Sequence, residues 1–383
     1  MTTSPTTTDP APAPVQVPTR AAGALTVDLS AIAENYRRLK AAFQQRAVAA
    51  VVKADGYGLG AARVAPVLVK AGARSIFVAQ LDEALALRPL LDACQPAVSL
   101  YVLNGLMPGA EIDYVDNNIL PVLNSLGEIE AWSRLARQRE TALPAAVHLD
   151  SGMCRLGLPP EEIERLRGDP ARLDGVVPTC ILSHLACADE ADHPKNREQL
   201  AALKTALSAL PEAPVSLCNS SGIFLGADYH FQLARPGIAL YGGNPTPQAA
   251  NPMRPVVRLA ARILQVRTID APQTVGYGAV HRATGPARIA TIAAGYADGY
   301  LRSISCRGHA WVAGHRVPVV GRVSMDLLAL DVTGIAPEMV RPGLWAELLN
   351  DAQDADALAQ EAGTISYEVL TSLGARYHRV YKD

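Results

Sequence analysis

The chain has 383 residues, enough for about two domains if one of them is barrel-sized. Apolar residues make up 49% and charged residues 19%, so the composition excludes a disordered protein. A net charge of −2 excludes electrostatic binding of nucleic acids or of anionic membranes, and no apolar run approaches the ~20 residues of a membrane-spanning helix. Because the charged fraction is below the usual ~25%, we expect part of the surface to be covered in a large core or by a partner.

The cysteines are scattered and form no Cys-x-x-Cys pair. A disulfide scaffold or a zinc site needs closely spaced cysteines. The sequence therefore predicts buried, reduced thiols in a cytoplasmic protein without a metal centre. The six cysteines are Cys94, Cys154, Cys180, Cys187, Cys218 and Cys306.

The first 23 residues are mostly Thr, Pro and Ala, and only Asp9 and Arg20 are charged. Such a segment cannot bury a core, so residues 1–23 are predicted to form a disordered tail. The segment also lacks the basic start and the apolar centre of a secretory signal. This again favours a cytoplasmic location.

From residue 24, strand-like and helix-like segments alternate. A strand is predicted over 25–29, and Ser30 is placed to cap a helix whose apolar face runs from Ile32 to Phe43. Residues 47–52 form a short apolar run, which is typical of a strand covered on both faces. A helix from about residue 61 should end at Gly72. Further strands are predicted over 75–79, 98–103, 119–123, 145–149, 176–182 and 214–217.

This alternation predicts the fold class. Repeated strand–helix units favour a parallel sheet, and about eight of them close into a barrel. The pattern ends at a Gly-Gly-Asn-Pro-Thr-Pro segment that begins at Gly242, and strand-like runs follow over 256–269, 287–293, 316–323 and 327–332. The prediction is an α/β fold, with a TIM-like (β/α)8 barrel over 24–245 and a mainly β domain over 246–383.

Function in such a barrel sits where the strands end, so polar groups at those points are candidates. Lys53 ends the apolar run 47–52 and precedes a Gly-rich turn that contains Tyr57. A lysine that closes a strand is usually solvated. The alternative is an amine in the barrel mouth, kept nucleophilic by partial desolvation and able to form a Schiff base.

Other predicted strands also end in polar groups. Arg155 follows the strand that ends near His148, and Ser183-His184 ends the next one. Asn219-Ser220-Ser221 is placed to cap a helix that could bind a phosphate, and Arg235 closes the series. Each group alone has an ordinary structural explanation, such as a surface ion pair or a plain helix cap. Their repetition at successive strand ends favours a functional site.

Together these motifs resemble those of the alanine racemases, which depend on pyridoxal phosphate. The resemblance extends in order from about residue 24 to the end of the chain, across both predicted domains. The matching segments are Ala50-Val-Val-Lys53-Ala-Asp-Gly-Tyr57-Gly, Asp150-Ser-Gly-Met-Cys-Arg155-Leu-Gly, Ser183-His184, Asn219-Ser220, Arg235-Pro-Gly-Ile-Ala-Leu-Tyr-Gly, Gly276-Tyr277-Gly, Gly295-Tyr296-Ala-Asp298-Gly, Gly321-Arg-Val-Ser-Met325-Asp326 and Ser366-Tyr367-Glu-Val.

The resemblance implies how the cofactor is held. Lys53 resembles the lysine that carries pyridoxal phosphate, and Arg235 the arginine that faces its pyridine nitrogen, with Asn219 nearby. His184 would link Arg235 to a catalytic tyrosine, and Arg155 would contact the cofactor's phenolic oxygen and the substrate carboxylate. The positions that resemble the phosphate-binding ones are Tyr57, Ser220, Gly237, Ile238 and Tyr367.

The resemblance also implies a homodimer with shared active sites. Tyr277, Met325 and Asp326 would reach the site from the partner subunit, with Tyr277 as the second catalytic base opposite Lys53. Two bases are needed because the α-carbon loses a proton on one face and regains it on the other. The implied reaction is interconversion of L-alanine and D-alanine, with D-alanine supplied to peptidoglycan. Tyr296, Asp189 and Arg302 resemble residues of the access corridor, where Tyr296 forms the inner gate.

Three positions depart from the family pattern. Many members carry a carbamylated lysine where this chain has His148, so an anion, His148 itself or another carboxylate would have to steady Arg155 here. Leu59 replaces a common histidine, and Ser324 a common cysteine. Alternative hypotheses are a racemase of different specificity, such as for serine, a decarboxylase on the same scaffold, or a non-catalytic carrier of pyridoxal phosphate.

Overall fold

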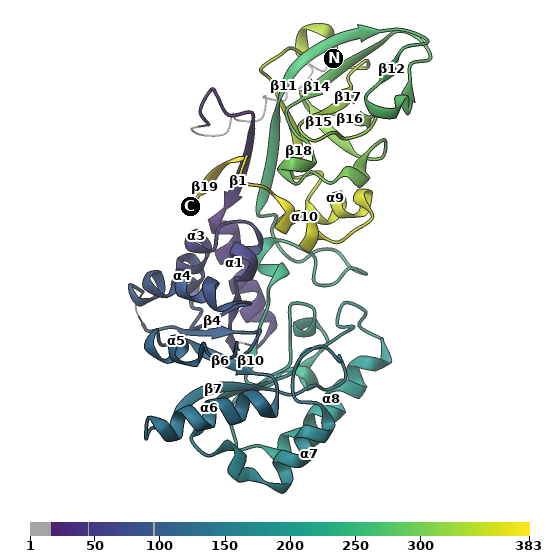
Figure 1. Cartoon of the computed structure of the whole chain (residues 1–383). Coiled ribbons are helices and arrows are strands. Elements are labelled where there is room, and N and C mark those ends of the chain that lie inside the picture. The colour runs from purple at the N-terminus through teal and green to yellow at the C-terminus, as the bar shows by residue number, and fades with distance from the viewer. Residues whose placement is uncertain (1–16, 45, 95) are drawn as a thin grey trace, which may run out of the picture. The chain divides into compact units, whose positions relative to one another are not determined.

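The computed structural model describes residues 17–383 except residues 45 and 95. Most of the predicted disordered tail, up to residue 16, therefore lies outside the described residues. The chain divides into two compact units. One consists of residues 31–254, and the other joins the described residues 17–30 to residues 255–383 (Figure 1).

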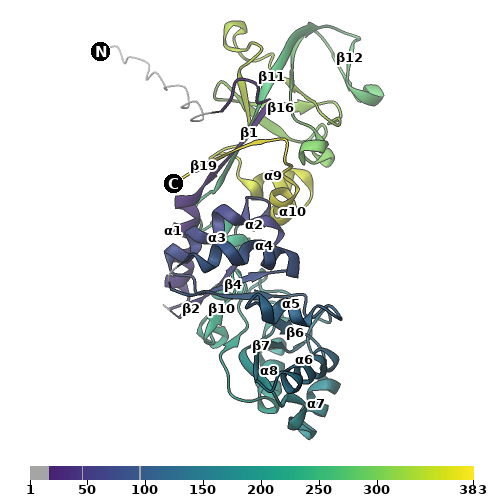
Figure 2. The same ribbon diagram turned by 60° about the vertical axis from the view of Figure 1, so that its left-hand side comes forward.

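The unit formed by residues 31–254 is a parallel barrel with helices on its outside (Figures 1 and 2). Neighbouring strands from β3 to β9 pair in parallel, in chain order. β10 closes the ring. On one side it pairs with β2. On the other side, Gln232 N donates to Val215 O of β9, and Arg235 N donates to Cys218 O just after β9. The predicted TIM-like barrel is confirmed. Its strands are β2 (Ala47–Val48), β3 (Ala50–Val51), β4 (Ser75–Val78), β5 (Ser99–Val102), β6 (Leu120–Leu123), β7 (Leu143–His148), β8 (Val176–Leu182), β9 (Val215–Ser216) and β10 (Leu233–Ala234).

The barrel helices follow from apolar residues at helical spacing. α3 buries Val64 and Leu68 against the barrel and ends at Gly72 as predicted. α1 begins one residue before Ser30, and the Ser30 hydroxyl donates to Asp28, so the prediction of a Ser30 cap is wrong. The helices are α1 (Leu29–Ala42), α2 (Lys53–Tyr57), α3 (Ala61–Ala71), α4 (Leu81–Asp92), α5 (Glu111–Asp116), α6 (Leu126–Gln138), α7 (Pro160–Gly168) and α8 (Pro194–Ala206).

The first strand of the chain lies outside the barrel. β1 (Gly23–Asp28) pairs antiparallel with β11 and parallel with β19, which places it in the sheet of the other unit. The prediction of this strand as a barrel strand is therefore wrong, and β10 was not predicted. The barrel reaches closure without β1, because β10 supplies the missing parallel edge next to β2.

The other unit is built on a mainly antiparallel sheet in the order β14-β17-β16-β15-β18-β11-β1-β19. The long strand β11 also pairs with β14, so six of these strands form a closed ring around buried residues such as Leu259, Ile263 and Leu330. The mainly β prediction is confirmed. Its further elements are β11 (Val257–Ile269), β12 (Thr274–Val275), β13 (His281–Arg282), β14 (Ala287–Ile292), β15 (His309–Val312), β16 (His315–Val320), β17 (Leu328–Asp331), β18 (Trp345–Leu349), β19 (His378–Lys382), α9 (Ala355–Ala362) and α10 (Ser366–Ser372).

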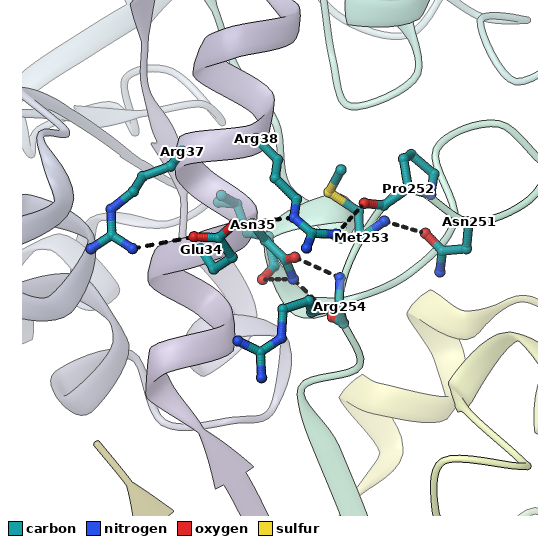
Figure 3. Close-up of polar contacts among 9 residues, drawn as sticks. Glu34, Asn35, Arg37, Arg38, Asn251, Pro252, Met253 and Arg254 are labelled. Carbon is teal, nitrogen blue, oxygen red and sulfur yellow. Dashed lines mark hydrogen bonds and ion pairs between the residues drawn. The ribbon is translucent and has the colours of Figure 1, made fainter.

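The residues that follow Gly242 stay with the barrel up to Arg254, nine residues beyond the predicted boundary at 245. Asn35 of α1 is fully buried, accepts from Arg254 N at 2.7 Å, and donates to Arg254 O at 2.9 Å and to Leu240 O at 3.3 Å (Figure 3). Arg38 donates to Pro252 O at 2.8 Å. These hydrogen bonds give backbone groups of residues 252–254 partners on α1, so the segment belongs to the barrel unit.

The cysteines are only partly as predicted. All six are free, and Cys180 and Cys218 are buried, but Cys154 and Cys306 are exposed. Within the described residues, no helix is both long enough and apolar enough to cross a membrane.

Candidate active site

Lys53 lies at the carboxyl end of the barrel strands, directly after β3 and at the start of α2. Burial lowers the pKa of its amine below the usual value, and the positive charge of Arg155 lowers it further, while Glu83 acts in the opposite direction. A larger share of the amine is therefore unprotonated near neutral pH than in a solvated lysine. This favours the nucleophilic alternative for Lys53.

The turn after Lys53 is left-handed. Ala54, Asp55, Gly56 and Tyr57 all have φ between 53° and 63°, which costs roughly 1 kcal/mol or more for each non-glycine residue. The Asp55 carboxylate accepts from Ala61 N at 2.8 Å and so holds the turn against the start of α3. Such strain persists only where the surroundings hold it, and it is typical of functional sites.

Glu83 supports the same turn and was missed by the sequence analysis. Its carboxylate accepts from the backbone N–H groups of Ala54, Ala79 and Gln80, so it ties the residue after Lys53 to the start of α4. The Gln80–Glu83 spacing of a capping box was the available signal.

Tyr57, Ser220 and Gly237 converge on one small region of the barrel. A Cβ added to Gly237 would lie only 2.0 Å from the Tyr57 hydroxyl, so the phenol occupies the space that a side chain would need. Ser220 Oγ accepts from Gly237 N at 3.0 Å and from Ala239 N at 3.3 Å. The Ile238 N–H has no hydrogen-bond partner in the described part of the chain and remains available. These groups offer two hydroxyls and a backbone donor to an anion.

Arg235 is buried at the end of β10 and anchors two neighbouring strands. Its guanidinium donates to Ser216 O at 2.9 Å and to Ser183 O at 2.6 Å, and it lies 3.5 Å from His184 Nδ1. Burial and the charges of Arg235 and Arg155 hold the pKa of His184 well below its usual value, so this imidazole is neutral. Because arginine can only donate, Nδ1 accepts and the single ring proton resides on Nε2.

Gln199 of α8 positions His184 and was also missed. It is fully buried, donates from Nε2 to His184 O at 2.8 Å and accepts from Ala186 N at 2.8 Å. Its sequence context is an ordinary amphipathic helix, so no local signal marks it.

His148 does not replace a carbamylated lysine as an anion. Burial, together with Arg235, lowers its pKa to about 3, so the ring is neutral. Its Nδ1 lies 2.7 Å from Asn124 Oδ1, and the Asp150 carboxylate accepts from the backbone of Gly152, Met153 and Cys154 instead of pairing with an arginine. Arg155 is exposed.

Asn219 makes a structural contact, and its predicted place near the cofactor stays a prediction. Its Oδ1 accepts from Gly222 N at 2.8 Å, at the start of the short turn Gly222–Phe224, whose N-cap residue is Ser221. The adjacent Ser220 belongs, with Tyr57, Gly237 and Ile238, to the group of residues that offers donors to an anion, which we call the anion-binding region.

The second unit brings together Tyr296, Met325 and Asp326. Tyr296 N donates to Ser324 O and Ala297 N to Met325 O, so the Tyr296 turn and the Met325 loop are in contact. Arg376 pairs with Asp326 at 2.7 Å and with the buried Asp298 at 2.9 Å, and thereby fixes this loop. Sequence analysis missed Arg376, because the pairing joins segments 50 residues apart.

Tyr277 and Tyr367 lie elsewhere in the second unit. Tyr277 is 73% exposed on the hairpin between β12 and β13, where Gly276 and Gly278 have positive φ. Tyr367 belongs to α10 and is 41% exposed. The roles assigned to both residues stay predictions.

Comparison with known families covers almost the whole described chain. The model of the family "Alanine racemase, N-terminal domain" matches residues 27–245, and that of "Alanine racemase, C-terminal domain" matches residues 256–381. The chain belongs to the alanine racemase family. Membership in this family of isomerases confirms the resemblance, and it sets aside the hypotheses of a decarboxylase and of a single-domain carrier.

Individual relatives agree with the family match. A protein named "Alanine racemase, catabolic" from Agrobacterium fabrum is 51% identical over 94% of this chain and 92% of its own length. An alanine racemase from Rhodospirillum rubrum is also 51% identical, over 94% of this chain and 96% of its own. The crystal structure of alanine racemase from Bartonella henselae with covalently bound pyridoxal phosphate is 41% identical, with a TM-score of 0.90 over 94% of this chain and all of that chain.

Proposed function

We propose that the chain is a pyridoxal-phosphate-dependent enzyme that interconverts L-alanine and D-alanine. The observation that carries the proposal is that two functional groups share the turn 53–57 at one end of the barrel. One is the amine of Lys53, whose pKa is lowered, and the other is the phenol of Tyr57, which belongs to the anion-binding region. The names of the relatives and the cofactor of the Bartonella henselae structure support it.

The barrel residues fit the cofactor. Tyr57, Ser220 and the free Ile238 N–H would hold its phosphate, close to Gly237, where there is no room for a side chain. Lys53 would hold its aldehyde carbon, and the buried guanidinium of Arg235 would face its pyridine nitrogen. When bound, pyridoxal phosphate supplies the electron sink that acidifies the α-proton of an amino acid. Tyr367 would add to the phosphate contacts.

Two residues would move protons on opposite faces of the substrate α-carbon. Lys53 serves one face, and Tyr277 of the partner subunit serves the other in a homodimer. The 73% exposure of Tyr277 and the 54% exposure of Met325 support this, because large apolar side chains left exposed often await a partner. A second chain that covers Tyr277 and Met325 is also consistent with the low fraction of charged residues in the sequence.

His184 would assist the phenol. Its ring proton resides on Nε2, because Arg235 occupies the Nδ1 side. A neutral Nε2–H can donate to the tyrosine oxygen when that oxygen carries negative charge, and so favours proton transfer through it. Arg155, and Met325 and Asp326 of the partner subunit, would bind the substrate carboxylate and shape the site, while Tyr296 would line its access.

The metabolic role proposed is supply of D-alanine for peptidoglycan. The test of activity is incubation of the purified, cofactor-loaded enzyme with each common L-amino acid, followed by chiral separation of the products. Formation of D-alanine ahead of other D-amino acids is expected, and a preference for serine would overturn the assigned specificity. Deletion of the gene from its own genome tests the biosynthetic role, because a strain that depends on this enzyme for peptidoglycan would then need added D-alanine to grow.

Gly237→Ala is expected to weaken binding of pyridoxal phosphate by at least about tenfold, because the new methyl group displaces the Tyr57 hydroxyl from the phosphate region. Titration of the apoenzyme, followed by cofactor absorbance, measures the change. Gly168→Ala is the matched control, since an added Cβ there meets nothing within 4 Å. Equal affinity in both variants would remove Gly237 from the cofactor site.

Arg155→Met is expected to move the pH dependence of cofactor capture to higher pH. The charge of Arg155 helps to lower the pKa of Lys53, so its removal raises that pKa, and the unprotonated amine then becomes available only at higher pH. Stopped-flow absorbance across a pH series reports the midpoint. A midpoint that stays in place or falls contradicts the assigned interaction.

A further inference from the structure

A cavity bordered by basic side chains lies at the opposite end of the barrel from Lys53. It has a volume of about 230 Å³ and is lined by residues at the amino ends of three strands, Ala47 and Val48 of β2, Ser75 of β4 and Leu233 of β10. Because the barrel strands are parallel, these ends face away from the end that carries Lys53. The six residue-to-residue steps of extended chain from Ala47 to Lys53 separate the two sites by about 20 Å.

Three cationic side chains line this cavity: Lys40, Arg46 and Arg74. The described lining contains no carboxylate. The remaining ionisable group is Tyr36, whose pKa is raised to about 12 by burial, so its hydroxyl stays neutral. Glu34, the acidic residue of α1, pairs with Arg37 and Arg38 instead (Figure 3). The cavity therefore concentrates positive charge without an internal counter-ion.

Two of the cations are held in place by the backbone. Arg74 donates from Nη1 to Val69 O at 3.0 Å and to Ala73 O at 2.8 Å. Arg46 donates from Nη1 to Phe231 O at 2.9 Å and also to His230 O. Each guanidinium is thus oriented through one nitrogen, and its other N–H groups, which bond to none of the described residues, remain for a ligand. Preorganised cations of this kind lower the entropy cost of binding an anion.

We propose that this cavity, which we call the basic cavity, binds a small phosphate-bearing anion. Two guanidinium groups and an ammonium group around one space suit the several oxygens and the double charge of a phosphate. The volume lies below the ~300 Å³ of the smallest drug-sized pockets, so the ligand is a phosphate with at most a small substituent. The site is separate from the anion-binding region near Ser220 and does not depend on the proposed reaction.

The test uses the enzyme loaded with its cofactor, so that the region near Ser220 is filled. Isothermal titration with inorganic phosphate is expected to show one saturable site per chain. Lys40→Gln and Arg74→Gln should each weaken this binding by about tenfold, as expected for loss of a charge-assisted hydrogen bond. Lys204→Gln is the matched control, because Lys204 also lies in the last turn of a barrel helix but does not line the cavity.

Several outcomes would overturn the proposal. They are absence of saturable binding with both inorganic phosphate and pyrophosphate, equal affinity in all three variants, and binding of malonate as tight as that of phosphate. Thermal unfolding in phosphate-free buffer checks that the variants fold. Lys40→Gln is the safest of them, because no described hydrogen bond or ion pair holds Lys40. Cofactor absorbance that stays constant during the titration shows that phosphate is not displacing pyridoxal phosphate.

Discussion

Lys53→Ala is expected to lower kcat for alanine racemisation by at least about a thousandfold and to let the cofactor dissociate during dialysis. The amine lies at the end of β3, its pKa is lowered by burial and by Arg155, and it precedes a strained turn that Glu83 and Asp55 hold in place. Racemisation followed by circular dichroism, and cofactor content after dialysis, measure the two losses.

The matched control is Lys70→Ala, since Lys70 is an exposed lysine in the last turn of α3. Added methylamine should restore part of the activity of Lys53→Ala, because a free amine can replace the missing proton carrier. A structural role for Lys53 would give no such rescue. Full activity of Lys53→Ala would contradict the proposed mechanism.

The sequence predicted the long strands of the barrel well, because apolar runs such as 176–182 are local features. It could not predict that β1 joins β11 and β19, since that pairing depends on segments more than 200 residues away. It also missed β10, which has two residues and therefore no periodicity. Arg235, at the end of β10, was the indirect signal that a strand end was there.

Of the candidate site, the sequence predicted groups that follow a strand or belong to a motif. Lys53, His184 and Arg235 lie at the carboxyl ends of β3, β8 and β10, as expected for a barrel enzyme. Residues that act through contacts remained hidden: Gln199 and Arg376 show their roles only through the hydrogen bonds and ion pairs that they make in three dimensions. Neutral His148 cannot supply a negative charge beside Arg155. The remaining candidates for a negatively charged partner of Arg155 are a bound anion and another carboxylate.

Tyr277→Phe is expected to impair proton removal from one alanine enantiomer far more than from the other, by about a hundredfold to ten-thousandfold. The change deletes a single oxygen from an exposed ring on the β12–β13 hairpin, so the fold should persist. Exchange of the α-hydrogen for deuterium, measured separately from L-alanine and D-alanine, reports each face of the substrate. By the facial assignment proposed here, exchange from L-alanine should suffer most. Equal slowing of both exchanges would contradict a two-base mechanism.

The same variant tests whether the site is shared between subunits. Lys53→Ala and Tyr277→Phe homodimers should each be nearly inactive, but a mixed dimer would unite one intact Lys53 with Tyr277 of the partner subunit. If subunits exchange at random, half of the dimers are mixed and each has one complete site, so about a quarter of the wild-type activity should return. Recovery after denaturation and refolding of the mixture, but not of either variant alone, is the decisive measurement. A site built within one chain gives no recovery, because every chain in the mixture then lacks one of its two bases.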